Sequence, residues 1–246
     1  MKIKYRLSSS TDNIFRFKQF SVDQTGCAMK VNTDGVLLGV LSEAGVAGRV
    51  LDIGTGTGVI ALILAQRMAS ANIKAIEIDQ SAAITARRNF ERSIFNSRLE
   101  ILHTPFEDFF KGSKEKFDLI VSNPPFFIDS LKSDDQFKGI ARHTDQIFFE
   151  NLMEGSALHL TDDGLLELIV PVRLSETLQA LGRKSGLILR QKISICSFPD
   201  SLPHREILVF AFRSGETALS RFVIYNKPKE YSMAYQEALK DFFTIF

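Results

Sequence analysis

The chain has little cysteine: Cys27 and Cys196 are its only two among 246 residues. Two cysteines cannot build a disulfide framework, and neither has the Cys-x-x-Cys or Cys/His spacing of a metal site. We therefore expect both to pack as small apolar residues and predict no metal. The sequence also lacks an apolar run of membrane-spanning length and the apolar core of a signal peptide. These absences predict a cytoplasmic protein with no membrane partner.

A dense basic run is absent as well, although the charge is unevenly distributed. Residues 1–40 carry six Lys and Arg against three Asp and Glu, and residues 171–246 carry eleven against seven. The central residues 41–170 carry thirteen against nineteen. The basic flanks fit a surface for a nucleic acid backbone. They fit equally well with ordinary solvated faces, so charge alone leaves both readings open.

Apolar runs of strand length alternate with segments of helical period along the chain. This alternation predicts an α/β fold with a mostly parallel seven-stranded sheet, helices on both faces and an antiparallel C-terminal hairpin. We expect one domain over residues 1–246, with 1–40 as an N-terminal extension that contributes to the binding sites. The expected strands are 49–53, 72–78, 99–103, 117–121, 164–170, 187–198 and 205–212, and a short edge strand is possible at 221–225. The expected helices are 58–69, 80–95, 146–159, 173–184 and 231–246.

One tetrapeptide combines a side-chain amide, two prolines and an aromatic ring: Asn123-Pro124-Pro125-Phe126, directly after the apolar run 117–121. The amide oxygen of Asn123 can accept a hydrogen bond, Pro124 offers a carbonyl without an N–H, and Phe126 offers a flat face. This set suits a planar NH2 group. Taken alone, the prolines could equally do no more than end a strand.

A glycine-rich turn between a predicted strand and a predicted helix indicates a second site. Gly54, Gly56 and Gly58 allow a sharp turn, a close approach of the backbone to a ligand and free N–H groups at a helix start. Glu77 ends the next strand about 20 residues on, where a carboxylate can bind ribose hydroxyls. Asp79 is better placed to cap the following helix.

These motifs together resemble those of class I S-adenosylmethionine-dependent methyltransferases. A dinucleotide-binding dehydrogenase would have glycine where this chain has Val59. The Gly-x-Gly-x-Gly spacing after Asp52 is similar to the first motif of the methyltransferases, and Asn-Pro-Pro-Phe is similar to the fourth motif of those that methylate planar nitrogens. The resemblance implies a Rossmann-like methyltransferase fold with S-adenosyl-L-methionine as cofactor.

Over nearly the whole chain the sequence resembles bacterial tRNA1(Val) adenine-N6 methyltransferases, which modify adenine 37 beside the anticodon. The blocks that carry the likeness are 15–20, 27–39, 141–144, 202–205 and 231–235. The resemblance implies tRNA as partner, through its anticodon stem-loop, and a catalytic set of Asn123, Pro124 and Phe126. It implies cofactor contacts at Lys30, Thr33, Asp34, Asp52, Gly54, Gly56, Gly58, Glu77, Phe106 and Asn123. Phe106 departs from the pattern, because related enzymes often have Asp there for the cofactor's adenine amine, so that contact would come from the backbone, Glu107 or Asp108.

Substrate contacts are expected at Pro125, Phe126, Phe127, Arg142, Lys18 and Arg205. We expect a monomer. We also expect no DNA partner, because the chain has no spare domain to read a duplex. Three alternatives stay open at the level of sequence: methylation of guanine N2 in ribosomal RNA, methylation of a protein glutamine amide, and a catalytically silent module that binds cofactor and RNA.

Overall fold

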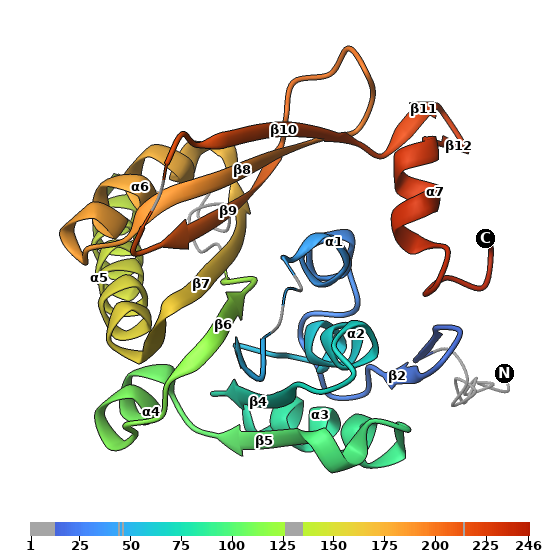
Figure 1. The fold of residues 1–246 in the computed structure, drawn as a ribbon, viewed down its shortest axis with the longest axis horizontal. Coiled ribbons are helices and arrows are strands. Elements are labelled where there is room, and N and C mark those ends of the chain that lie inside the picture. Colours follow the sequence, from blue (N-terminus) through green and yellow to red (C-terminus); the bar gives the residue numbers. More distant parts are fainter. Residues whose placement is uncertain (1–12, 44, 46, 126–134, 214) are drawn as a thin grey trace, which may run out of the picture.

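The computed structural model describes residues 13–43, 45, 47–125, 135–213 and 215–246, with backbone alone for 135–145. Its main element is an eight-stranded sheet with the order β10-β8-β9-β7-β6-β3-β4-β5 (Figure 1). Neighbouring strands are parallel except where β9 lies antiparallel between β7 and β8. The strands are β3 (Arg49–Ile53), β4 (Asn72–Glu77), β5 (Leu99–His103), β6 (Phe117–Ser122), β7 (Leu160–Pro171), β8 (Ile188–Cys196), β9 (Arg205–Ala211) and β10 (Ala218–Val223).

The α/β class and the antiparallel hairpin are confirmed. All seven predicted strands are present, and β8 and β9 form the hairpin with Ile193 opposite Ile207. The sheet has one strand more than the predicted seven, because β10 adds to the free edge of β8 in parallel, with Phe222 opposite Ile195. This strand begins at Ala218, three residues before the expected start of the edge strand. Phe222 is buried, so the apolar core holds the extra strand in place.

Helices cover both faces of the sheet, as predicted (Figure 1). Helix α5 begins at Asp135, much earlier than expected, and α4 was not predicted because seven residues are too few to show a helical period. The helices are α1 (Thr33–Leu41), α2 (Val59–Arg67), α3 (Gln80–Arg92), α4 (Phe106–Gly112), α5 (Asp135–His159), α6 (Ser175–Lys184) and α7 (Met233–Leu239).

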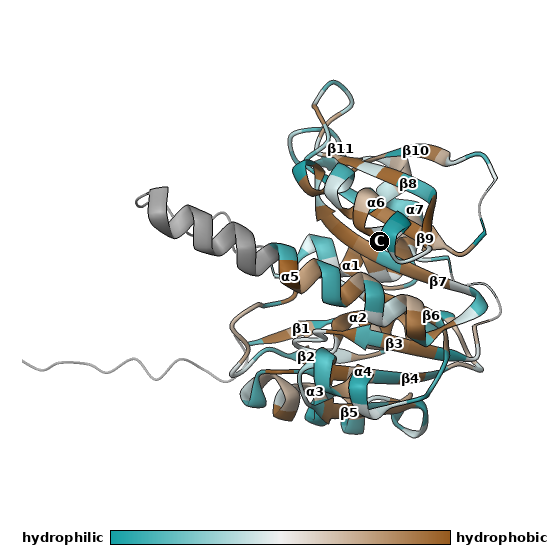
Figure 2. Ribbon diagram, turned by 90° about the vertical axis from the view of Figure 1, so that its left-hand side faces the viewer, coloured by the Kyte–Doolittle hydropathy of each residue, from teal (hydrophilic) through white to brown (hydrophobic). Residues whose placement is uncertain are grey.

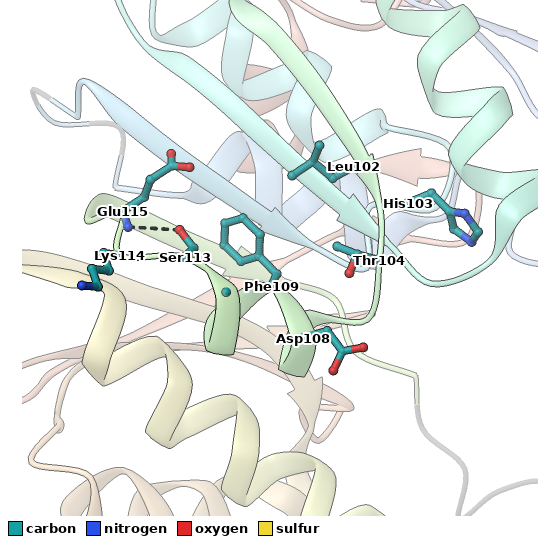
Figure 3. A pocket seen from close by; sticks show the side chains of 9 residues that line it. Leu102, His103, Thr104, Asp108, Phe109, Ser113, Lys114 and Glu115 are labelled. Carbon is teal, nitrogen blue, oxygen red and sulfur yellow. Dashed lines mark hydrogen bonds between the residues drawn. The ribbon is translucent and has the colours of Figure 1, made fainter.

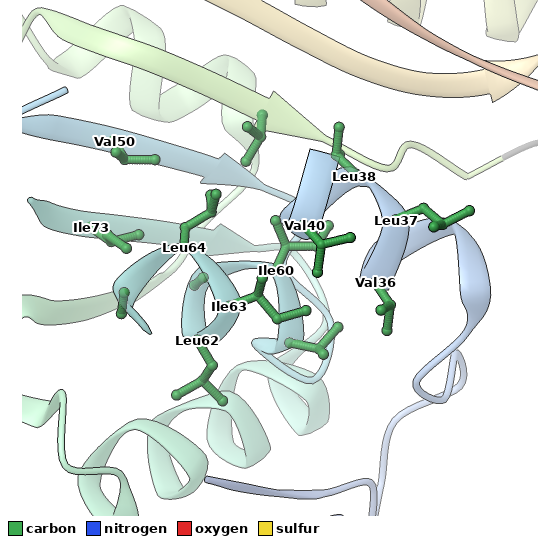
Figure 4. Close-up of a cluster of buried hydrophobic side chains, with 14 of the residues drawn as sticks. Val36, Leu37, Leu38, Val40, Val50, Ile60, Leu62, Ile63, Leu64 and Ile73 are labelled. Carbon is green, nitrogen blue, oxygen red and sulfur yellow. The ribbon is translucent and has the colours of Figure 1, made fainter. Parts of the chain in front are cut away.

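Two apolar layers hold the helices to the sheet, because successive side chains of a strand point to opposite faces. In β3, Val50 packs with α1, α2 and α3, while Leu51 packs with α4, α5 and α6. Figure 4 shows the first layer, where leucines and isoleucines of α2 meet the valines and leucines of α1. Helices α1 and α2 come close at Gly39, where a Cβ would lie 2.9 Å from Cγ2 of Ile63. Figure 2 shows hydrophobic residues along β7 and β9, in the centre of the sheet, and seven of the nine residues of α2 are buried as well.

The two ends of the described chain pack together. The short strands β1 (Ile14–Arg16) and β2 (Ser21–Asp23) form a two-stranded sheet, and the ring of Phe17 lies 5.7 Å from that of Phe243. The ammonium of Lys18 donates to the backbone oxygen of Phe246 at 2.8 Å. The strands β11 (Tyr225–Lys227) and β12 (Glu230–Tyr231) precede α7, which contacts both β10 and α1. Residues of the N-terminal extension thus share one core with the C-terminal helix.

Within the described residues, no helix is long and apolar enough to cross a membrane, and no cluster of acidic, His and Cys side chains could hold a metal ion. Both cysteines are free. Cys196 is buried as expected, whereas Cys27 lines a cavity.

Candidate active site

The carboxyl ends of three neighbouring strands bring the predicted motifs together. Ile53 of β3 pairs with Ile76 of β4 on one side and with Ser122 of β6 on the other. The hydroxyl of Ser122 donates to the backbone oxygen of Ile53 at 2.9 Å and joins the strand ends. The residues that follow, Gly54 and Asn123, are therefore neighbours. In open α/β sheets, ligands bind where the strand order reverses, and β3 and β6 are the strands at that point here.

A cavity of about 460 Å³ lies at this edge of the sheet. Its size suits a nucleoside-sized ligand. It is lined by seven of the residues expected from the sequence: Lys30, Gly54, Gly56, Glu77, Phe106, Asn123 and Pro125. Thr33, Asp34, Asp52, Gly58 and Pro124, also expected there, do not line it.

The glycines of the turn fall into two kinds. All three have positive φ, at 70° for Gly54, 57° for Gly56 and 83° for Gly58. A Cβ on Gly54 or Gly56 would meet nothing within 4 Å, so open space lies beside both residues where they line the cavity. A Cβ on Gly58 would lie 2.5 Å from Cε1 of Phe90 on α3. Gly54 and Gly56 therefore leave room for a ligand, whereas Gly58 leaves room for the buried ring of Phe90.

Glu77 organises the cavity through its two carboxylate oxygens. One accepts from the backbone N–H of Gly56 at 2.8 Å, and the other accepts from that of Asp79 at 2.9 Å. A carboxylate oxygen has two lone pairs, so each oxygen can still accept from a ligand hydroxyl. Asp79 caps α3 as expected, since its side chain accepts from the backbone N–H of Ala82 at 2.8 Å.

Asn123 presents an unused acceptor. Its amide oxygen is buried and has no hydrogen-bond partner among the described residues, although the residue lines the cavity. Leaving a buried polar atom without a partner costs about 1–3 kcal/mol. Nine such side-chain atoms occur among the described residues, and Asn123 is the one of these nine residues that lines the cavity, where a ligand could supply the donor. The neighbouring Pro125 is exposed. Phe126 and Phe127 lie outside the described residues, as does the side chain of Arg142.

Asp52 lies beneath the glycine turn. It is fully buried, and its carboxylate accepts from the hydroxyl of Thr55 at 2.5 Å, within the turn. Burial raises the pKa of Asp52 to about 7, because the charged form loses its hydration. Near the C-terminal end of α1, the fully buried Glu167 of β7 accepts from the backbone N–H of Glu43 at 2.9 Å, and burial also raises its pKa to about 7. The hydrogen bond from Thr55 to Asp52 thus holds the glycine turn to β3.

These two carboxyl groups should make the protein less stable as pH rises. Their pKa values are raised from 3.8 and 4.5, so the folded state binds the proton more tightly than the unfolded state. Their contribution to the free energy of unfolding should be greatest below about pH 4 and fall toward pH 7, by on the order of 1–3 kcal/mol per group. Asp52→Asn and Glu167→Gln should each flatten this dependence, and the double variant more than either.

Urea denaturation between pH 4.5 and 7.5 measures the effect. Glu43→Gln is the matched control, because its half-exposed carboxylate pairs with Arg190 and the backbone N–H that serves Glu167 remains. That variant should keep most of the slope of the unmodified protein, because the Glu43 charge is a smaller cause of the raised pKa of Glu167 than burial is. An unchanged slope in the double variant would contradict the assignment.

Two predicted contacts form an ion pair with each other. Nε of Arg205, the first residue of β9, lies 2.7 Å from the carboxylate of Asp34 in the first turn of α1. Asn32 caps the same helix by accepting from the backbone N–H of Gly35 at 2.9 Å. Asn32 and Gly35 both line the cavity. The ion pair between Arg205 and Asp34 thus ties the start of α1 to the C-terminal hairpin.

The far end of the cavity is aromatic. Phe106 opens α4 and lines the cavity together with Thr104, Pro105, Glu107 and Phe148. Asp108, the other acidic candidate for this end, lines a separate hollow between β5 and α4 with Leu102, Phe109 and Glu115 (Figure 3). Of the two carboxylates considered from the sequence, only that of Glu107 belongs to a residue of the cavity.

Sequence reasoning missed Ile78, Thr104, Pro105 and Phe148 as cavity residues, whereas Asn32 lies within the block 27–39 that carries the resemblance. Thr104 follows the predicted strand 99–103 and Ile78 ends the predicted strand 72–78, so their positions at strand ends were a usable signal. Phe148 had no such signal, because an aromatic residue within an amphipathic helix is most often part of the core.

The chain is similar to known methyltransferases throughout. The model of the "Methyltransferase small domain" family matches residues 31–184. A tRNA1(Val) (adenine(37)-N6)-methyltransferase of Pedobacter heparinus is 44% identical over 95% of this chain and 99% of its own length. One of Bacteroides thetaiotaomicron with the same name is 38% identical over 93% of this chain and 96% of its own. The crystal structure of a predicted O-methyltransferase from Agrobacterium tumefaciens has a similar fold, with a TM-score of 0.65, 18% identity and coverage of 85% of this chain and 96% of its own.

Proposed function

The chain belongs to the methyltransferase family of the tRNA1(Val) (adenine(37)-N6)-methyltransferases, and from this membership we propose that it methylates the exocyclic N6 of adenine 37 in tRNA1(Val). The methyl donor is S-adenosylmethionine. We further propose that residues 1–246 act as one domain and as a monomer in the cytoplasm, where tRNA is modified. The shared core of the N-terminal extension and α7 supports the single domain.

The observation that carries the proposal is the unpartnered amide oxygen of Asn123 beside the glycine turn. An adenine amino group would supply the missing donor. Because its lone pair is delocalised into the ring, adenine N6 is a poor nucleophile. Hydrogen bonds from N6 to Asn123 and to the carbonyl of Pro124 would favour a more pyramidal nitrogen. The residues would then act mainly by orientation, which is worth up to roughly 7–11 kcal/mol in favourable cases.

S-adenosylmethionine supplies an electrophilic methyl group on a positively charged sulfur. Transfer neutralises that charge, so the chain needs no strongly basic residue, and the proton of N6 can leave to solvent. In this proposal Gly54 and Gly56 give close backbone approach and Glu77 accepts from the ribose. Lys30 and the start of α1, with Thr33 and Asp34, face the methionine end, while Asp52 and Gly58 support the turn. Glu107 is the candidate partner for the cofactor's adenine amine, next to Phe106.

On the RNA side, adenine 37 must leave its stack to reach the cavity, which an unpaired anticodon loop permits. We propose that Phe126 and Phe127 replace the lost stacking, at about 1–3 kcal/mol per base, and that Arg142 contacts the anticodon stem-loop. Pro125 is exposed at the cavity mouth. Lys18 and Arg205 have weaker support, since the first bonds the C-terminal backbone and the second pairs with Asp34.

Methyl transfer from labelled S-adenosylmethionine to a tRNA1(Val) transcript, followed by nucleoside mass spectrometry, tests the proposal. We expect N6-methyladenosine in the anticodon loop. Ribosomal RNA and bulk protein serve as parallel substrates, because label found as N2-methylguanosine or methylglutamine would keep the role of Asn123 and overturn the substrate. Cofactor binding without transfer to any of them would indicate a silent binding module.

A further inference from the structure

Phe148 links the cavity to the helix that follows the Asn-Pro-Pro motif in the chain. It lies on α5, is half-buried and lines the cavity, whereas its neighbour Phe149 is buried in the core. The ring of Phe148 packs edge to face on that of Phe106, with 5.2 Å between centroids and 77° between planes. Its exposed part is therefore available to a ligand at the aromatic end of the cavity.

Phe106 has a second aromatic neighbour that separates packing from ligand contact. The ring of Phe110 lies 5.9 Å from that of Phe106 at 79°, nearly the same geometry. Phe110 does not line the cavity, and it stacks instead on His159 at 4.5 Å. The two rings thus support Phe106 alike, but only Phe148 can touch what the cavity holds.

We propose that Phe148 forms part of the wall for the cofactor's adenine ring, and that cofactor binding stabilises helix α5 through this contact. The inference rests on the proposed function in taking an S-adenosyl cofactor as the ligand. The glycine turn and Glu77 suit the ribose and its neighbours, so the purine falls at the end that Phe106, Pro105 and Phe148 line. An aromatic pair of this kind is worth about a two- to tenfold change in affinity.

Because Phe148 lies on α5, its contact with the cofactor should affect the placement of this helix as well as cofactor affinity. A ligand that touches α5 favours the placement of that helix in which the touch is made, and such coupling is reciprocal. Whatever binds to α5 should therefore bind more tightly when the cofactor is present. Phe148 is therefore a positioning residue, because it couples cofactor binding to substrate binding at α5.

Binding of S-adenosylhomocysteine and of 5′-methylthioadenosine to the full chain, measured by calorimetry, tests the first half. Both ligands contain adenine, so Phe148→Ala should weaken both by the same factor, about tenfold, and Phe148→Leu by less. Phe110→Leu is the matched control and should stay within about twofold of the unmodified protein, since it loosens Phe106 from the side away from the cavity. Circular dichroism verifies that each variant is folded.

Hydrogen exchange of α5 peptides with and without S-adenosylhomocysteine tests the second half. We expect the ligand to slow exchange in the unmodified protein and in Phe110→Leu, but not in Phe148→Ala at ligand saturation. Unchanged affinity in Phe148→Ala, an equal loss in Phe110→Leu, or protection of α5 that survives Phe148→Ala would each overturn the inference. Cofactor binding without tRNA methylation would defeat the proposed function alone, while normal methylation with unchanged Phe148→Ala affinity would defeat this inference alone.

Discussion

Asn123→Ala should lower the rate of methyl transfer to tRNA by about a hundred- to a thousandfold while the protein still binds S-adenosylhomocysteine. The amide oxygen is buried, has no hydrogen-bond partner among the described residues and belongs to a residue of the cavity, so we expect a donor from the substrate to bind it. Removing one oriented hydrogen-bonding group that acts on the reacting atom typically costs this much in rate. Single-turnover methylation of a tRNA1(Val) transcript measures the loss, and calorimetry measures cofactor affinity.

Two variants control for that result. Asn123→Asp keeps an oxygen acceptor at the same place and should retain more activity than Asn123→Ala. Ser122→Ala alters the adjacent residue, which also lines the cavity but whose hydroxyl donates to the backbone oxygen of Ile53, and it should stay within a few-fold of the unmodified rate. Near-normal turnover in Asn123→Ala would refute the model in which Asn123 holds the amino group.

Gly58→Ala should destabilise the fold by about 2–5 kcal/mol. A left-handed φ of 83° costs an L-residue about 1–2 kcal/mol, and the new Cβ would lie 2.5 Å from Cε1 of Phe90. Phe90 is 3% exposed and cannot swing aside, so overpacking adds about 1–3 kcal/mol. Urea denaturation at a fixed pH measures the free energy of unfolding.

Gly54→Ala is the matched comparison, because its φ of 70° carries the same strain but its Cβ meets nothing within 4 Å. We expect a stability loss of only about 1–2 kcal/mol. The methyl group would occupy space beside the cavity, so S-adenosylhomocysteine should bind at least about tenfold more weakly. Equal stability losses in the two variants would show that Phe90 does not constrain Gly58.

The local elements could be read from the sequence because their signals are local. The strand 99–103 was predicted with its observed bounds, and the Asp79 cap followed from a short polar side chain before a helical period. The start of α5 was not predicted, because residues 135–145 are mostly polar and their apolar residues at helical spacing, Phe137, Ile140 and Ala141, are too few to set them apart from a loop. Strand β10 was misplaced by three residues, since its bounds depend on pairing with β8.

For the site, the sequence by itself determined the chemistry that is available: glycines that permit a positive φ, an acidic strand end, and an amide followed by prolines. These are properties of side chains and of short backbone segments, and they do not depend on the tertiary structure. Only the tertiary structure decided which atoms meet. The pairing of Ile53 with Ser122 places the amide beside the glycine turn, and the approach of α3 makes Gly58 a packing residue. Packing against α4 turns Phe148 from an apparent core residue into a wall of the cavity, because contacts between distant segments follow from strand order and helix packing and not from local sequence.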